Sequence, residues 1–129
     1  MSFVVSTIDA TGVPTLAYIP KDIIQRFYTY EPVRYENFRA VKEVLEHPLA
    51  IFRGVRMLTV GGWCYIGRPE KWCVSEGVFA DFPQHLLFAV YLNPLMHVYE
   101  FRAESAENVD PVRSLWRERF GELAWKHTS

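Results

Sequence analysis

The stretch that most constrains the fold of this chain runs from Leu86 to Glu104. Its first half, Leu86 to Leu92, is apolar at every position, which is typical of a strand that is covered on both faces. The next residues, 93–95, favour a turn because Pro94 fixes its own φ and cannot donate a ladder hydrogen bond. From residue 96 onward the side chains alternate between the two faces of a second strand. The stretch therefore predicts a central β-hairpin.

Alternation along the second strand assigns its polar side chains to opposite faces. His97 and Tyr99 are expected on one face, and Glu100 and Arg102 on the other. Four residues of the hairpin are expected to be among the least exposed in the protein, namely Phe88, Val90, Tyr99 and Phe101.

The rest of the chain predicts one α+β domain over residues 1–129, with a mostly antiparallel sheet packed by N-terminal helices and one C-terminal helix. Apolar residues at spacings of three and four, or proline at a first helical position, mark the helices. The segments predicted as helices are 20–30, 32–46 and 111–120. The segments predicted as further strands are 3–8, 13–19, 57–60, 63–66 and 72–74.

Composition and charge exclude several classes of protein. Half of the residues are hydrophobic, which argues against disorder, and no apolar run is long enough to span a membrane. A net charge of −1 gives no global attraction for nucleic acid or acidic lipids, so we expect no membrane partner. Cys64 and Cys73 are expected to be two buried thiols, which suits a soluble protein of the cytoplasm. The scattered histidines predict no metal site, and we expect no cofactor.

His97, Glu100 and Arg102 have the right chemical types for acid–base catalysis. Metal-independent RNA cleavage needs a base for the 2′-hydroxyl proton, an acid for the leaving oxygen and a cation for the charge on the phosphorane. Because His97 is assigned to the opposite strand face, a bulge or a neighbouring strand would have to bring the three together. The alternative is a half-exposed histidine at a turn beside a surface ion pair.

Charge is unevenly distributed along the chain. Basic residues, including Arg56, gather between 53 and 71, and acidic residues gather between 100 and 110. A basic strip beside an acidic one would suit a cleft that acts on RNA, with Trp63 and Tyr65 as stacking platforms for bases. The alternative is that the two segments neutralise each other and that the aromatic residues pack in the core.

Arg68 lies between Gly67 and Pro69, a context that restricts the backbone around one arginine. A planar guanidinium on a stiff loop suits a carboxylate or phosphate. We therefore expect Arg68 to present its side chain to an anion, either an internal carboxylate such as Glu100 or Glu104, or an external ligand.

Three segments carry a resemblance to known proteins. They are Pro-x-x-Ile-Phe-x-Gly-x-Arg at 48–56, Gly-Trp-Cys-Tyr-x-Gly-Arg-Pro at 62–69, and Val-Tyr-Glu-Phe-Arg-Ala-Glu at 98–104. Together they make the chain resemble a family of small uncharacterised bacterial proteins. The order of helices, strand pair and hairpin is also similar to the barnase, EndoU and RelE group of ribonuclease toxins, a similarity that implies an activity on RNA.

Two functions therefore remain open. One is a metal-independent, ribonuclease-like domain that acts on RNA. The other is a non-enzymatic module that binds a protein partner or a second copy of itself through exposed aromatic residues. If the protein is an enzyme of this kind, five candidate polar residues should converge in one pocket, namely Arg56, Arg68, His97, Glu100 and Arg102.

Overall fold

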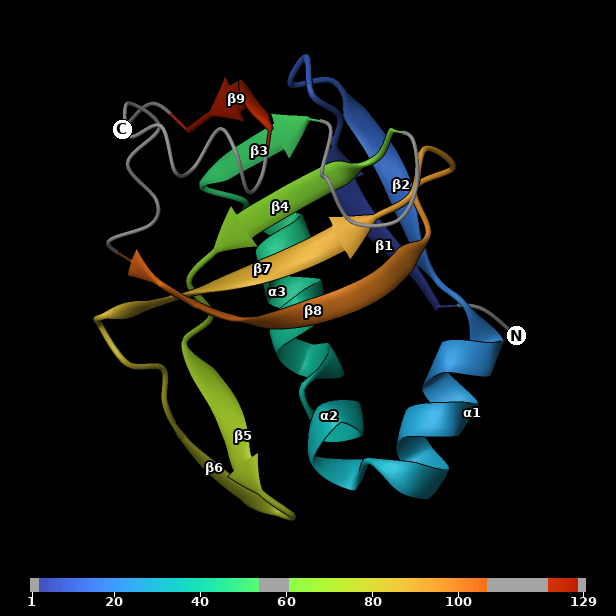
Figure 1. The fold of residues 1–129 in the computed structure, drawn as a ribbon, viewed down its shortest axis with the longest axis vertical. Coiled ribbons are helices and arrows are strands. Elements are labelled where there is room, and N and C mark those ends of the chain that lie inside the picture. The colour runs from blue at the N-terminus through green and yellow to red at the C-terminus, as the bar shows by residue number, and fades with distance from the viewer. Residues whose placement is uncertain (1–2, 54–60, 107–120, 128–129) are drawn as a thin grey trace.

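The computed structural model confirms the central hairpin (Figure 1). Strand β7 (Leu86–Leu92) pairs antiparallel with β8 (Val98–Ser105), and Val90 lies opposite Phe101. The residues that the structure describes are 3–53, 61–106 and 121–127. Within them the chain forms one α+β domain with mostly antiparallel strands, as predicted.

The hairpin belongs to a sheet whose described strands follow the order β8-β7-β4-β3-β9. Strand β4 (Trp63–Gly67) joins β7 to β3 (Ala50–Arg53), and all neighbours are antiparallel. The far edge is β9 (Glu122–Lys126), a strand that was not predicted from the sequence. That strand forms because its backbone pairs with β3, a partner far away in the sequence that no local pattern identifies.

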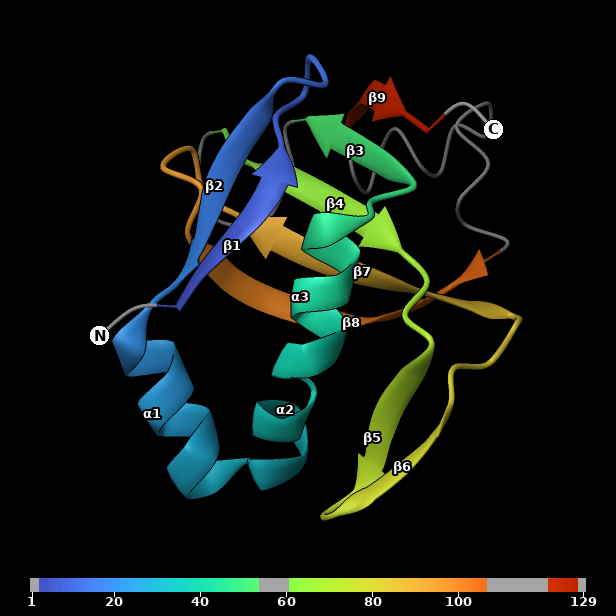
Figure 2. The same ribbon diagram turned by 180° about the vertical axis from the view of Figure 1, so that it is seen from behind.

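Three helices lie at the N-terminal side of the described chain: α1 (Lys21–Tyr30), α2 (Pro32–Glu36) and α3 (Phe38–Glu46). Figure 2 shows α3 lying across the back of the sheet. The prediction of one helix over 32–46 is wrong, because Asn37 separates α2 from α3.

The helix break at Asn37 has a tertiary cause. Its side-chain amide donates hydrogen bonds to the carbonyls of Val33 and Cys73, at 3.1 and 3.0 Å. Its Oδ1 accepts the backbone N–H of Cys73 at 2.7 Å. One buried asparagine therefore holds the junction of α2 and α3 against the strand that carries Cys73.

Two small hairpins complete the described fold. The first pairs β1 (Phe3–Ile8) with β2 (Pro14–Ile19), as predicted, and a backbone bridge joins Tyr18 of β2 to His97. The second pairs β5 (Lys71–Ser75) with β6 (Val78–Asp81). Strand β6 was not predicted, because its alternation is too short to stand out beside the flanking turn signals.

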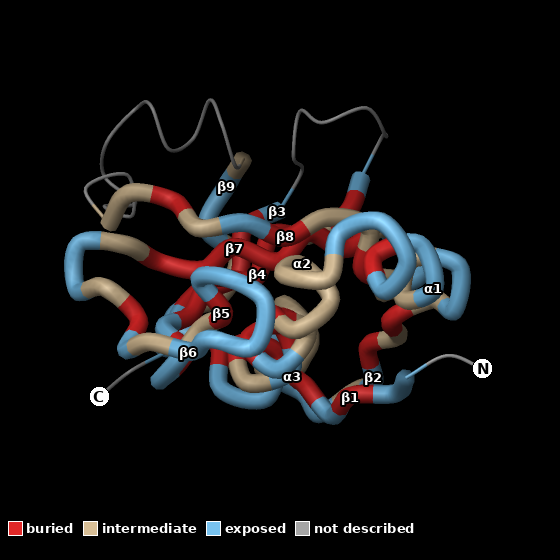
Figure 3. Tube along the Cα trace, turned by 90° about the horizontal axis from the view of Figure 1, so that it is seen from below, coloured by how far each residue is buried: buried red, intermediate tan, exposed pale blue. Residues whose placement is uncertain are grey.

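The main sheet is buried on both faces, as Figure 3 shows for its central strands. Residues that pack on the face toward α3 include Val41, Val90 and Phe101. On the opposite face, buried residues include Phe52, Cys64 and Tyr91. Burial on both faces explains why β7 is apolar throughout.

A β-bulge in β8 changes the predicted alternation. Tyr91 lies opposite Glu100 while Leu92 lies opposite Val98, so Tyr99 is an extra residue in the ladder. Phe88, Val90 and Phe101 are buried as predicted, but Tyr99 is only half-buried. The extra residue also turns Tyr99 toward the face that carries Tyr91, where it packs against the second buried cluster.

The predicted helix 111–120 and the predicted strand 57–60 lie outside the described residues. None of the helices in the described part of the chain is long and apolar enough to cross a membrane. Cys64 and Cys73 are both buried, as predicted.

Candidate functional site

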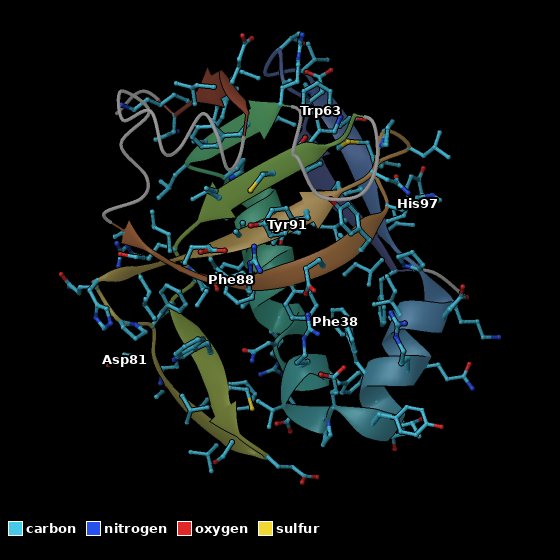
Figure 4. All side chains as sticks on the ribbon, viewed as in Figure 1. Phe38, Trp63, Asp81, Phe88, Tyr91 and His97 are labelled. Atoms are coloured by element: carbon cyan, nitrogen blue, oxygen red, sulfur yellow. The ribbon has the colours of Figure 1, made fainter. Side chains whose placement is uncertain are left out.

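The structure brings together part of the predicted catalytic set. Glu100 and Arg102 line a pocket of about 370 Å³ beside the edge strand β8, together with Arg34 of α2 and Trp72 of β5. We call this the edge pocket. His97 does not line this pocket. Figure 4 shows His97 at one end of the β7–β8 hairpin, away from Phe88, which lines the pocket.

Arg34 is the central cation of the edge pocket, and sequence reasoning missed it. Its guanidinium forms an ion pair with Glu100 and donates to the carbonyl of Phe101 at 3.2 Å. The guanidinium also lies over the rings of Phe27 and Phe101, at 4.4 and 5.0 Å from the ring centroids. A second carboxylate, that of Glu31, lies 3.7 Å from it. Glu100 in turn accepts the N–H of Phe101 at 2.8 Å. Both partners are therefore already used in joining α2 to the edge of the sheet.

Arg102 is also engaged. Its Nε lies 2.6 Å from the buried carboxylate of Glu104, and its guanidinium lies over the ring of Tyr91 at 5.5 Å. The Tyr91 hydroxyl donates to Glu104 at 3.4 Å, and burial raises the pKa of Tyr91 well above its ordinary value. The arginine thus belongs to a polar network on the sheet face that lies away from α3.

His97 has a structural environment. Its ring meets the ring of Tyr18 edge-on at 5.5 Å, and its backbone N–H donates to the side chain of Asn93 at 3.0 Å. These contacts place it in the β7–β8 turn against β2, and the bulge at Tyr99 does not bring it to the edge pocket. The structure therefore brings Glu100 and Arg102 to one pocket without His97.

The predicted ligand-binding residues are separated as well. Arg56 lies outside the described residues. Arg68 is exposed and donates to the carbonyl of Pro83 at 3.1 Å. Trp63, at the start of β4, lies beneath the guanidinium of Arg53 at 5.5 Å. Glu100 and Glu104, the internal partners considered for Arg68, pair with other arginines.

Tyr65 cannot act as a stacking platform, because its side chain is fully buried. Its hydroxyl donates to the carbonyl of Ile8 at 2.6 Å. Burial, and then the charge of Asp9, raise the pKa of Tyr65 well above its ordinary value. The residue ties β4 to the first hairpin, which is the core role that the sequence left open as an alternative.

A second depression is lined mainly by aromatic side chains. It has a volume of about 380 Å³ and is formed by Phe3, Tyr35, Phe38 and Phe79, with Glu36 and Arg39 beside them. We call this the aromatic groove. Phe3 is 61% exposed and Phe79 is 40% exposed. Neighbouring Tyr28, 66% exposed, meets Tyr35 edge-on at 5.1 Å and extends the aromatic surface.

The two charged residues of the aromatic groove differ in their surroundings. Glu36 accepts hydrogen bonds from the thiol of Cys73 and the N–H of Gly77, both at 2.9 Å, which lower the pKa of its carboxyl. Burial, and then Glu36, raise the pKa of the Cys73 thiol. Arg39 lies over the ring of Phe79 at 5.9 Å and, within the described residues, has no carboxylate partner.

Sequence reasoning missed this groove because its members come from β1, the α2–α3 segment and β6. Each aromatic residue read alone is equally consistent with core packing, and exposure depends on the tertiary arrangement. The one available signal was the high aromatic content, 16% of the chain.

No group of three or more histidine, cysteine, aspartate or glutamate side chains among the described residues is arranged to hold a metal ion. The chain was also compared with known proteins. No family model, no curated protein and no solved structure matches it.

Proposed function

We propose that this protein is a non-enzymatic interaction module that binds a protein partner through the aromatic groove. The observation that carries the proposal is the groove itself, in which exposed Phe3 and Phe79 flank the half-buried Tyr35 and Phe38. Exposing such rings to water is costly, and contiguous aromatic surfaces mark binding sites more often than chance. Tyrosine, phenylalanine and arginine are also the residue types that interface cores favour.

The charged side chains beside the aromatic groove indicate what kind of partner it would bind. Glu36 keeps its negative charge but already accepts two internal hydrogen bonds, whereas Arg39 has no ion-pair partner among the described residues. Glu43, four residues further along α3, instead accepts the backbone N–H of Glu70 at 3.1 Å. A segment that places an apolar or aromatic side chain in the groove and a carboxylate beside Arg39 would complement it.

The edge pocket supports catalysis less well. Its cations are matched by carboxylates of the protein, Arg34 by Glu31 and Glu100, and Arg102 by Glu104. Little excess positive charge remains for a phosphodiester, and the pocket contains no histidine to protonate a leaving oxygen.

The test is selection of binders from a displayed random-peptide library on the immobilised protein. We expect enriched peptides that combine an aromatic or large aliphatic residue with a nearby Asp or Glu. Their affinity should fall by about tenfold or more for Phe79→Ala and for Arg39→Glu, because each removes an anchor of the contact.

The matched control is Leu95→Ala, which truncates a side chain that is 72% exposed on the β7–β8 turn and does not line the groove. This variant should bind the selected peptides as the parent does. Peptides that bind the Phe79→Ala variant with unchanged affinity would contradict the proposal. A dimer that sedimentation detects and Arg39→Glu dissociates would assign the groove to a second copy of the chain instead.

A ribonuclease-like activity is the second candidate function. The observation that favours it is that Glu100 and Arg102, predicted from the sequence, do share one pocket with Arg34 and Trp72. A carboxylate base between two arginines beside an indole could bind a nucleotide and activate a 2′-hydroxyl.

Incubation of the purified protein with total RNA, with and without a chelator, tests this candidate. Cleavage that persists with chelator and disappears in Glu100→Gln would support it. Intact RNA at every protein concentration would leave the edge pocket as a structural joint between α2 and β8.

A further inference from the structure

A third pocket lies where the end of α3, the start of β3 and strand β9 meet. It has a volume of about 340 Å³, and its lining includes Glu46, His47, Leu49, Trp125 and His127. We call it the imidazole pocket. The backbone fixes its walls, because Leu49 accepts the N–H of His127 at 2.8 Å and donates to the carbonyl of Ile66 at 2.7 Å.

The polar side chains of the imidazole pocket are unengaged, unlike those of the edge pocket. Within the described residues, the side chains of Glu46, His47, Trp125 and His127 have no hydrogen-bond or ion-pair partner. The ring of Trp125 lies 6.3 Å from the ring of His127, at an interplanar angle of 53°. Aromatic rings and the aliphatic side chain of Leu49 thus form the walls of the pocket. The hydrogen-bonding groups of Glu46 and the histidines lie beside them.

The chemistry of the lining narrows the class of ligand. Among the residues that the structure describes, the lining contains no lysine or arginine and one carboxylate, that of Glu46, so a phosphate would be repelled rather than bound. The pocket also lies outside any described group of side chains that could hold a metal ion. A carboxylate is an acceptor without donors, so it selects ligands that present N–H groups.

We propose that the imidazole pocket binds a neutral nucleobase, carried by a nucleoside, with its ring stacked on Trp125 and its amino edge donating to Glu46. The volume is at the lower end of the range for small-molecule sites and suits one base rather than a longer chain. His47 and His127 can each donate or accept, which lets them complete the hydrogen bonding of a heterocycle that carries both kinds of group. This site is independent of the aromatic groove and of the edge pocket.

The experiment is a titration of ¹⁵N-labelled protein with guanosine, adenosine and cytidine, followed through the indole N–H of Trp125. At least one of these nucleosides should give saturable shifts at Trp125 and at the amide of His127. Caffeine, which has a purine ring system without N–H donors, should bind more weakly than that nucleoside. The corresponding nucleoside monophosphate should bind no more tightly, because the described lining offers its phosphate no lysine or arginine.

The variant Glu46→Gln should weaken the nucleoside by about tenfold or more, because it removes a charged acceptor that receives the amino edge. Glu122→Gln is the matched control, since Glu122 is an exposed glutamate of β9 that does not line the pocket. Its affinity should equal that of the parent. The proposal is overturned if none of the three nucleosides gives saturable shifts up to its solubility limit. Equal affinity of the parent and Glu46→Gln would overturn it as well.

Discussion

Replacing Asn37 with alanine should destabilise the protein more than any typical surface substitution. Asn37 is 8% exposed, and its contact Cys73 is 3% exposed, so water has little access to the groups that the asparagine satisfies. The side chain makes three hydrogen bonds, two of them to the backbone N–H and C=O of Cys73. These two groups have to be paired for β5 to remain packed on the α2–α3 junction.

The magnitude follows from the groups left without a partner in Asn37→Ala. The carbonyl of Val33 still accepts the backbone N–H of residue 37 at 3.2 Å, so it is not orphaned. The N–H and the C=O of Cys73 are orphaned, and each buried unsatisfied group costs about 1–3 kcal/mol. The better helix propensity of alanine returns about 0.5 kcal/mol. We therefore expect the free energy of unfolding to fall by about 1.5–5.5 kcal/mol, a large part of the stability of a small domain.

Urea denaturation of the parent and the Asn37→Ala variant, followed by circular dichroism at pH 7, measures this loss. Gln25→Ala, on the exposed side of α1, is the control and should change the free energy of unfolding by less than about 0.5 kcal/mol. The isosteric Asn37→Asp should also be destabilised, because a carboxylate cannot donate to the two carbonyls. A loss in Asn37→Ala below about 1 kcal/mol would refute the reasoning, since it would mean that these groups find other partners.

Three further predictions concern single side chains. Tyr65→Phe should lower the free energy of unfolding by about 1–2 kcal/mol in thermal melts, because the substitution removes the hydroxyl that donates to the carbonyl of Ile8; an unchanged melt would contradict this. The thiol of Cys73 and a backbone N–H hold the pKa of the Glu36 carboxyl below its ordinary value. The stability that Glu36 contributes is therefore present above about pH 4.3, the pKa of a glutamate in the unfolded chain, and is lost as the pH falls below that value. Urea midpoints at pH 7 and pH 3.5 should therefore differ less for Glu36→Gln than for the parent, and an equal difference would argue against the bond. Arg68→Ala should change the free energy of unfolding by less than about 1 kcal/mol, because its one hydrogen bond is exposed; a larger loss would reveal an internal partner.

The local signals in the sequence were sufficient for the fold class and for the central hairpin. The apolar run of β7 and the turn at Pro94 specify the hairpin with no information from elsewhere. The bulge at Tyr99 could not be predicted, because one extra residue appears only when the two strands are set in register. The helix break at Asn37 was missed for a similar reason, since its partner Cys73 lies 36 residues away.

The candidate sites were less predictable than the fold. Glu100 and Arg102 were identified because they are close in sequence, but the cation that engages Glu100 is Arg34, 66 residues earlier. The same limit applies to the aromatic groove, where Phe3 and Phe79 meet through folding alone. Sequence patterns indicate which residue types are present, and long-range packing decides which of them are free to bind a partner.

The pairing of β9 with β3 also bears on the order in which the molecule folds. Ala50 lies opposite Lys126, so closing this pair encloses about 75 residues, with a length-dependent entropic cost of about 4 kcal/mol. The β7–β8 hairpin, whose strands are joined by a short turn, avoids most of that cost and can form early. We therefore expect β9 to be added late and to open first, so its amides should exchange with solvent faster than those of β7. Trp125 and His127 belong to this late segment. A ligand bound in the imidazole pocket should therefore stabilise the pairing of β9 with β3 and slow the opening of β9.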